Sequence, residues 1–291
     1  MRELKLIELY CAVCHHYDNT LVDLAQRMSN NFCPKFSDEE CIATLIWGIA
    51  NQKFDVKRCH EFIKDYYGEW FPNMPGYQTY NKRICFLADA FKALAGILLA
   101  GLGLDESHAD FIYDSMPIVV AGQKRSSSAK TAAELCDKTF CASKGMWYYG
   151  VKLHIIAQSN HKSLSTPAMM MVTKASEHDR PVAERMLDDV KNIRIFADTA
   201  LADKQWQAKM LAQNNVEILT PIKRDKGQKY LDAADTLFSR GVSSIKQVIE
   251  SLNNWLIEKT NIQRASKIRS ADGLNVFIFA RIACACFVFN Y

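Results

Sequence analysis

Residues 111–118 (FIYDSMPI) set the pattern from which the fold and the candidate site of this chain are predicted. The apolar residues indicate a buried strand that carries Asp114. A second apolar run, at 193–197 in IRIFADTALAD, ends at Asp198, and Glu250 lies in SSIKQVIESLNNW, which is typical of a long helix. A buried carboxylate is costly unless it is paired, hydrogen-bonded or bound to a cation. We therefore expect the three acids to converge on one site.

The segments around these acids predict a mixed α/β fold. Strands are expected at 111–120, 193–197 and 216–219, and the runs 147–156 and 165–172 read as one hairpin-like pair. Helices are expected at 201–213 and from Pro181 to Asp189, with proline as the first helical residue. Strands that alternate with helices in this order are typical of a mixed sheet flanked by helices.

The first 104 residues predict helices only. Ser37 followed by Glu40 is a capping-box pattern, Asp55 is placed to cap the next helix, and an apolar-periodic helix is expected from Tyr80 to Leu104. Several short helices suit a helix-turn-helix DNA-binding unit, and an accessory helical bundle is the alternative. We expect a helical region at 1–104 and an α/β domain at 105–291.

Charge and composition are compatible with a nucleic-acid partner. The chain has 291 residues, 49% hydrophobic and 23% charged, with a net charge of +4. Residues 222–269 hold ten Lys or Arg against five acids, and a polar loop at 122–130 is also basic. A local basic excess beside an acidic site favours a phosphodiester substrate, although an ordinary solvated surface has the same composition.

Cysteines and apolar runs indicate a reduced, cytoplasmic protein without a membrane span. The N-terminal segment lacks the apolar core of a signal peptide, so the ten cysteines are expected to be free thiols. Cys11 and Cys14 match half of a zinc site or a haem-attachment spacing, but we expect both to be core residues of a helix. The most apolar run, 274–289, is interrupted by Asn275 and Arg281 and predicts a buried C-terminal helix.

The three acids suit metal-dependent phosphodiester chemistry. Cleavage needs a nucleophile, charge relief on the phosphate and help for the leaving oxygen, and two divalent ions supply all three. Mg²⁺ takes mostly carboxylate and water ligands, so Asp114, Asp198 and Glu250 are the expected ligands of two Mg²⁺ (or Mn²⁺) ions. Two alternatives remain: Asp198 capping the helix near Leu201, and Glu250 forming an ion pair with Lys246.

Six segments carry a resemblance to a known family. DSMPI, KxxWYYGVKLHII, ASEHDRPVAERML, IFADTALADKQW, ILTPIKRDKG and VIESLNNWLIEK resemble the catalytic domain of bacterial insertion-sequence DDE transposases, closest to insertion-sequence family 982. The resemblance covers about residues 108–291. It implies a ribonuclease H-like fold and places the family's two aspartates and its glutamate on Asp114, Asp198 and Glu250.

The segment around Glu250 departs from the family pattern. Lys246 stands where the family often has arginine, Ser243 where it has tyrosine, and Ile257 where it has lysine. Lysine at position 246 suits a phosphate contact but not bidentate binding. Salt-sensitive contacts to the DNA backbone are expected from Lys124, Arg125, Lys130, Lys223, Arg224, Lys246 and Lys259.

The resemblance implies a transposase that cuts the ends of an insertion sequence and joins the freed 3′-hydroxyl to target DNA. Its expected partners are double-stranded DNA, as terminal inverted repeats and target, and further copies of the chain in a dimer or synaptic complex. One alternative is a catalytically inactive, transposase-derived DNA-binding protein. Another is a metal-dependent nuclease that cuts without joining.

Overall fold

The computed structural model describes residues 2–26, 34–105, 107, 109–160, 163–224 and 227–290. Within these ranges, five α-helices precede the first strand: α1 (Arg2–His16), α2 (Asp38–Ala50), α3 (Val56–Tyr67), α4 (Tyr77–Phe86) and α5 (Ala88–Ala100). The strands are β1 (Asp110–Gly122), β2 (Asp137–Cys141), β3 (Met146–Gln158), β4 (Thr166–Lys174), β5 (Ile193–Phe196) and β6 (Val216–Leu219). The remaining helices are α6 (Asp179–Met186), α7 (Lys204–Asn214), α8 (Ala233–Thr260) and α9 (Ala271–Asn290).

The chain divides into two compact units. The helical unit comprises Met1–Gly101, Lys130–Glu134 and Leu256–Tyr291, and the sheet unit comprises Leu102–Ala129 and Leu135–Trp255. The last 36 residues therefore group with the N-terminal helices and not with the sheet. This division differs from the contiguous segments, 1–104 and 105–291, that the sequence suggests, because α9 packs on α5 and α2.

Local signals in the helical unit act as the sequence predicts. Ser37 and Glu40 form a capping box at the start of α2, and Asp55 caps α3 through the backbone N–H of Arg58 at 2.9 Å. Within the described residues, α9 is the one helix long and apolar enough to cross a membrane, and 67% of its apolar window is buried inside the protein. The prediction of a buried C-terminal helix is confirmed.

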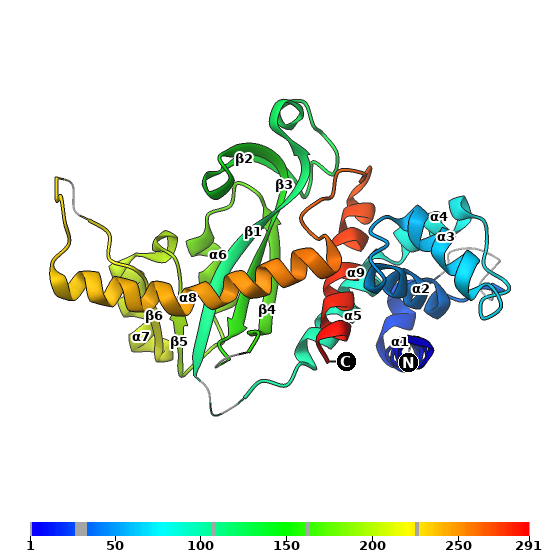
Figure 1. The fold of residues 1–291 in the computed structure, drawn as a ribbon, viewed down its shortest axis with the longest axis horizontal. Helices are drawn as coiled ribbons and strands as arrows, with labels where there is room; N and C mark the ends of the chain where they lie inside the picture. The colour runs from blue at the N-terminus through cyan, green and yellow to red at the C-terminus, as the bar shows by residue number, and fades with distance from the viewer. Residues whose placement is uncertain are drawn as a thin grey trace. The chain divides into compact units, whose positions relative to one another are not determined.

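The sheet unit contains a six-stranded mixed sheet (Figure 1). Its order is β2-β3-β1-β5-β6, and β4 pairs with β3 on the edge that β2 also uses. β3 runs antiparallel to β1, β2 and β4, whereas β5 and β6 run parallel to β1 and to each other. The predicted pairing of the runs near 147–156 and 165–172 is confirmed, but β2 had no clear apolar signal and was not predicted.

A bulge curls the two long strands where β1 passes Gly150. The pairing of β1 with β3 shifts register between Val119 and Ala121. A Cβ atom on Gly150 would lie 2.1 Å from the carbonyl oxygen of Ile118, so no side chain fits there. Glycine at this position permits the close approach of the strands.

Different helices pack on the two faces of the sheet. On one face, Tyr113, Ile156 and Ile195 pack with residues of α6 and α7, Trp206 among them, into a buried core. Successive residues of a strand point to opposite faces, so Asp114 points away from this core. α8 lies across β1 on that second face (Figure 1), with Val242, Ile249 and Leu252 buried.

Three local predictions are wrong. The single helix expected from Tyr80 to Leu104 is two helices, α4 and α5, which divide at Leu87. α6 begins at Asp179, so Pro181 is its third residue and not its first; the first-turn N–H groups have no partner within a helix, which lets proline sit there equally well. Cys11 is exposed and Cys14 half-buried, because the buried stripe of α1 runs through Leu6, Leu9 and Val13. Cys284 and Cys286 are buried in α9, as predicted.

Candidate active site

Asp114 lies in β1, and Asp198 lies two residues after the end of β5, the parallel strand beside it. β1 pairs with β5 from Asp110↔Arg194 to Ile112↔Phe196, a constant offset of 84 residues. Asp198 follows Asp114 by the same 84 residues, two positions beyond the last pair. An even step along two strands in register keeps side chains on the same face. The sheet thus brings the two carboxylates together on the face that α8 covers.

Lys246 of α8 joins the two carboxylates. Its Nζ lies 3.7 Å from Oδ1 of Asp114 and 3.4 Å from Oδ2 of Asp198. The side chains of Lys246 and Asp114 are mostly buried, whereas that of Asp198 is 54% exposed. Two acids that share one ammonium group form a centre with an excess of negative charge.

Asn253 holds the other oxygen of Asp114. Its Nδ2 donates a hydrogen bond of 2.8 Å to Oδ2 of Asp114, which connects α8 to β1. The Oδ1 of Asn253 is buried and accepts no hydrogen bond among the described residues. A buried amide oxygen without a donor is uncommon and calls for an explanation, such as a bound ion or water. Sequence reasoning missed Asn253, since its spacing of three from Glu250 is its only signal.

Glu250 occupies the same face of α8. It follows Lys246 by four residues and precedes Asn253 by three, and such positions stack on one side of a helix. Its side chain is exposed. Lys246 pairs with Asp114 and Asp198, so the alternative of a Lys246–Glu250 ion pair is not seen among the described ion pairs.

The two aspartates differ in their electrostatics. Burial raises the pKa of Asp114, with Asp198 adding to the rise, and Lys246 only partly offsets it. Burial acts in the same direction on Asp198, but Lys246 and hydrogen bonds from Ala200 N and Thr199 Oγ1 outweigh it and lower the pKa. The hydrogen bond to Ala200 N also makes Asp198 the cap of the short helix Thr199–Leu201. The longer helix expected from Leu201 begins instead at Lys204, as α7, and is capped by Asp203, so Asp198 caps only the short helix before it.

A polar network on the opposite face supports β1 behind Asp114. Asp179 accepts hydrogen bonds from Lys152 Nζ at 2.9 Å and from Ser115 Oγ at 3.0 Å. His154, fully buried, lies 2.6 Å from the hydroxyl of Tyr113. Lys152 and His154 share one face of β3, as their alternation predicts. This network holds Tyr113 and Ser115, the two neighbours of Asp114.

Most of the expected DNA-contacting residues are exposed, and they come from several separate segments of the chain. Lys124 and Arg125 lie in the turn after β1, and Lys223 and Arg224 follow β6. Lys130 and Lys259 belong to the helical unit, where Lys259 pairs with Glu258 at 3.4 Å. Lys246 differs from the others because it lies within the acidic centre. Asp225 and Lys226, in the same basic stretch, lie outside the described residues.

The donors around Asp114 have the chemistry of a site for a hard divalent cation. Carboxylate and amide oxygens are the ligands that Mg²⁺ prefers, and Asp114, Asp198 and the buried Oδ1 of Asn253 are of this kind. No three His, Cys, Asp or Glu side chains are gathered as ligands within the described ranges. Lys246 supplies the positive charge that the two aspartates share in this arrangement.

Comparison with known families places this arrangement in context. The family described as "Transposase DDE domain" matches residues 106–267, which include β1, β5 and the whole of α8 with Asp114, Asp198 and Glu250. No curated protein matches the chain.

Proposed function

Because the chain belongs to the transposase DDE domain family, we propose that it is a transposase of an insertion sequence, with Asp114, Asp198 and Glu250 as its catalytic acids. It would cut DNA at the element ends and join the freed 3′-hydroxyl to target DNA. We also infer that the sheet unit is a ribonuclease H-like domain, and that the resemblance of its motifs to insertion-sequence family 982 indicates a bacterial element.

One observation supports the assignment of the acids most strongly. Lys246 is shared by Asp114 and Asp198, which come from parallel strands in register, while Glu250 is one helical turn from Lys246. Three acids on two strands and one helix would therefore surround a position that already attracts positive charge. Asp114 contacts both Lys246 and Asn253 of α8, so it would hold a cation between the strand pair and the helix.

Both proposed reactions are displacements at phosphorus and can use the same residues. Two divalent cations, when bound, would supply charge relief on the phosphate and activate the attacking oxygen. Asp114, Asp198 and Glu250 would hold these cations. Asn253 would keep the Asp114 carboxylate in one orientation through its hydrogen bond.

Lys246 has a separate role in this proposal. Its ammonium group would leave the carboxylates when a divalent cation binds and move toward the DNA phosphate, as expected of the family position it occupies. A lysine acts as a flexible point charge, so it can make both contacts in turn.

The proposal is tested with a plasmid that carries the coding sequence and its flanking DNA. Purified wild-type protein with Mg²⁺ or Mn²⁺ should cut at the ends of the element and join a 3′-end to a second plasmid. Asp114→Asn, Asp198→Asn and Glu250→Gln should each bind the ends and do neither.

Two outcomes contradict the proposal and distinguish its rivals. Cutting without any joining would indicate a metal-dependent nuclease. Equal binding by wild type and all three variants, with cutting by none, would indicate a DNA-binding protein that has lost its activity.

A further inference from the structure

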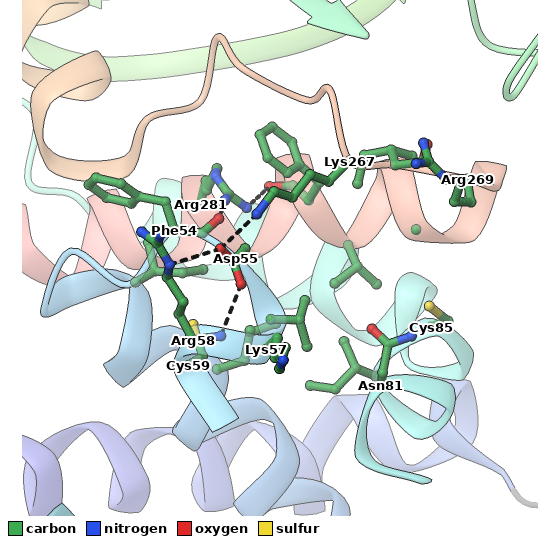
Figure 2. Close-up of a pocket in the computed structure, with 18 of the residues that line it drawn as sticks. Phe54, Asp55, Lys57, Arg58, Cys59, Asn81, Cys85, Lys267, Arg269 and Arg281 are labelled. Atoms are coloured by element: carbon green, nitrogen blue, oxygen red, sulfur yellow. Dashed lines mark hydrogen bonds and ion pairs between the residues drawn. The ribbon is translucent and has the colours of Figure 1, made fainter. Parts of the chain in front are cut away.

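A cavity of about 640 Å³ is lined entirely by residues of the helical unit (Figure 2). The apolar part of its lining includes Ile49, Ile84 and Phe277. Binding sites for small ligands commonly have volumes of about 300–1,000 Å³. The cavity is therefore large enough for part of a bound molecule.

Basic side chains dominate the polar lining. Six of the lining residues are basic and only Asp55 is acidic; the basic ones are Lys57, Arg58, Arg264, Lys267, Arg269 and Arg281. They come from α3, from the segment between α8 and α9, and from α9. Cations from three segments, gathered around one cavity, repel one another unless an anion is near.

The segment 261–270 presents three of these cations. It begins at Asn261, whose left-handed backbone (φ 52°) ends α8, and it closes at Ser270, whose Oγ accepts from the N–H of Gly273 at the start of α9. Ile262 and Ala265 are buried and anchor the segment. Arg264, Lys267 and Arg269 are left exposed between these anchors.

The basic residues are not equally available to a ligand. Asp55 lies between Lys267 and Arg58 (Figure 2), at 3.1 Å from Lys267 Nζ and 3.4 Å from Arg58 Nε. Arg281 is buried and donates to the carbonyl oxygens of Thr260, Phe277 and Phe54. Its guanidinium therefore serves the fold.

Arg264 and Arg269 are the basic residues of the lining that make the fewest hydrogen bonds and ion pairs within the protein. Neither forms an ion pair with any acid in the part of the chain that the structure describes, and Arg269 donates only to the carbonyl of its neighbour Ile268. They are the residues whose positive charge is most free to meet an external anion.

We propose that this cavity and its basic rim bind phosphate groups of the DNA backbone, as a contact separate from the acidic centre. The inference rests on the proposed function, which makes DNA the anion that the protein meets. Arg264 and Arg269 would bind phosphates directly, and Lys267 and Arg58, which share Asp55, would add positive charge to the same lining. Asn81 and Asn261 add amide groups to the lining.

The test measures binding of a fluorescent duplex of arbitrary sequence by anisotropy, across a salt series and in chelator. The full-length double variant Arg264→Gln/Arg269→Gln is compared with Lys64→Gln/Lys82→Gln, which removes two exposed charges of the helical unit outside the cavity. Each lost phosphate contact reduces the slope of log affinity against log salt by about 0.9. We expect the slope of the cavity variant to fall by about 1–2, with affinity falling on the order of tenfold, and that of the control pair to stay at the wild-type value.

Two further arms make the result decisive. Arg264→Lys/Arg269→Lys keeps the charge and should restore binding, which separates electrostatic contact from a folding defect. Inorganic phosphate alone, at millimolar concentration, should leave the melting temperature of the wild type unchanged. Stabilisation by phosphate that depends on Arg264 and Arg269, with normal DNA binding by the glutamine variant, would assign the cavity to free phosphate and overturn the DNA assignment.

Failure of this inference is distinguishable from failure of the proposed function. Equal salt slopes for wild type, the cavity variant and the control pair would overturn the cavity contact whatever the plasmid assay shows. A protein that never cuts but shows the expected loss of slope would lack the proposed activity and still use the cavity for DNA.

Discussion

Asn253 donates a 2.8 Å hydrogen bond to Asp114 across 139 positions of the sequence. The bond fixes one carboxylate oxygen and leaves the other facing Lys246 at 3.7 Å. A carboxylate that is held in this way presents a defined lone pair to a cation. Residues that hydrogen-bond to a metal ligand are known to change the affinity of the site for the metal. Asn253 and Lys246 thus hold the two oxygens of the Asp114 carboxylate from α8.

Replacing Asn253 by alanine should weaken the site without removing an acid. We expect Asn253→Ala to lower Mn²⁺ affinity, or the rate of DNA cleavage at limiting Mn²⁺, by about 10–100-fold. Mn²⁺ titration followed by calorimetry measures the first and a cleavage time course the second. Asn254→Ala, at the exposed neighbouring position, is the control; equal behaviour of the two variants would remove Asn253 from the site.

Lys246 should compete with divalent cations for the aspartates. Lys246→Met leaves Asp114 and Asp198 repelling each other, which we expect to cost about 1–2 kcal/mol of stability without metal, a figure reduced because Asp198 is half exposed. Mn²⁺ should then raise the melting temperature of this variant more than that of the wild type. Adding Asp114→Asn to Lys246→Met should abolish the extra response. A smaller Mn²⁺ response in Lys246→Met than in the wild type would show that lysine helps to hold the metal.

His154 makes the stability of the sheet unit depend on pH. Burial lowers the pKa of His154 to about 4, despite the opposing effect of Asp179, and Lys152 and Arg185 lower it further. Tyr113 Oη lies 2.6 Å away and Thr173 Oγ1 2.9 Å away, so these groups from β1 and β4 hold the ring. The unfolded chain takes up a proton near pH 6.5, and the folded chain does so only near 4.

Stability should therefore fall as pH decreases through this window. Between pH 6.5 and 4 the unfolded state binds more protons, so the free energy of unfolding decreases by up to about 3 kcal/mol from this group. Urea denaturation across that range should show the slope in the wild type and a weaker one in His154→Gln. His15→Gln, at an exposed position, should keep the wild-type slope. A full slope in His154→Gln would assign the effect to other groups.

Gly150 should be required for the curl of β1 and β3. Gly150→Ala places a methyl group where the carbonyl oxygen of Ile118 lies, and backbone at this point cannot yield without breaking the pairing. We expect a loss of several kcal/mol, as for other overpacked sites. Gly96→Ala, in α5 with open space around it, should instead be neutral or stabilising. Thermal denaturation of both variants compares them, and equal stability would contradict the account of the bulge.

Local sequence signals predicted much of this structure. Apolar runs located β1, β5 and β6, and capping residues located the starts of α2 and α3, because these patterns depend on neighbours in the chain. The positions of Asp114 and Asp198 also predicted that β1 and β5 are neighbours. A carboxylate at the end of a buried strand is costly unless it is paired or bound to a cation, so the two acids were expected to share one site.

The features that were not predicted depend on packing between residues far apart in the sequence. Nothing in residues 274–289 specifies α5 as their partner, so the membership of α9 in the helical unit was not foreseen. Asn253 was missed because an amide on a helix is ordinary until its partner is known. Lys246 was expected at the DNA backbone. Its contact with Asp114 and Asp198 depends on the register of two strands far apart in the sequence and on the packing of α8 against them, which no local pattern specifies.

Diffraction from crystals soaked in Mn²⁺ would show whether the three acids form one metal site, since anomalous scattering locates the metal without reference to activity. We expect manganese peaks ligated by Asp114, Asp198 and Glu250, with the ammonium group of Lys246 displaced from the two aspartates. Bound manganese elsewhere, or Lys246 still joining Asp114 and Asp198 at saturating Mn²⁺ while Glu250 faces solvent, would contradict this expectation.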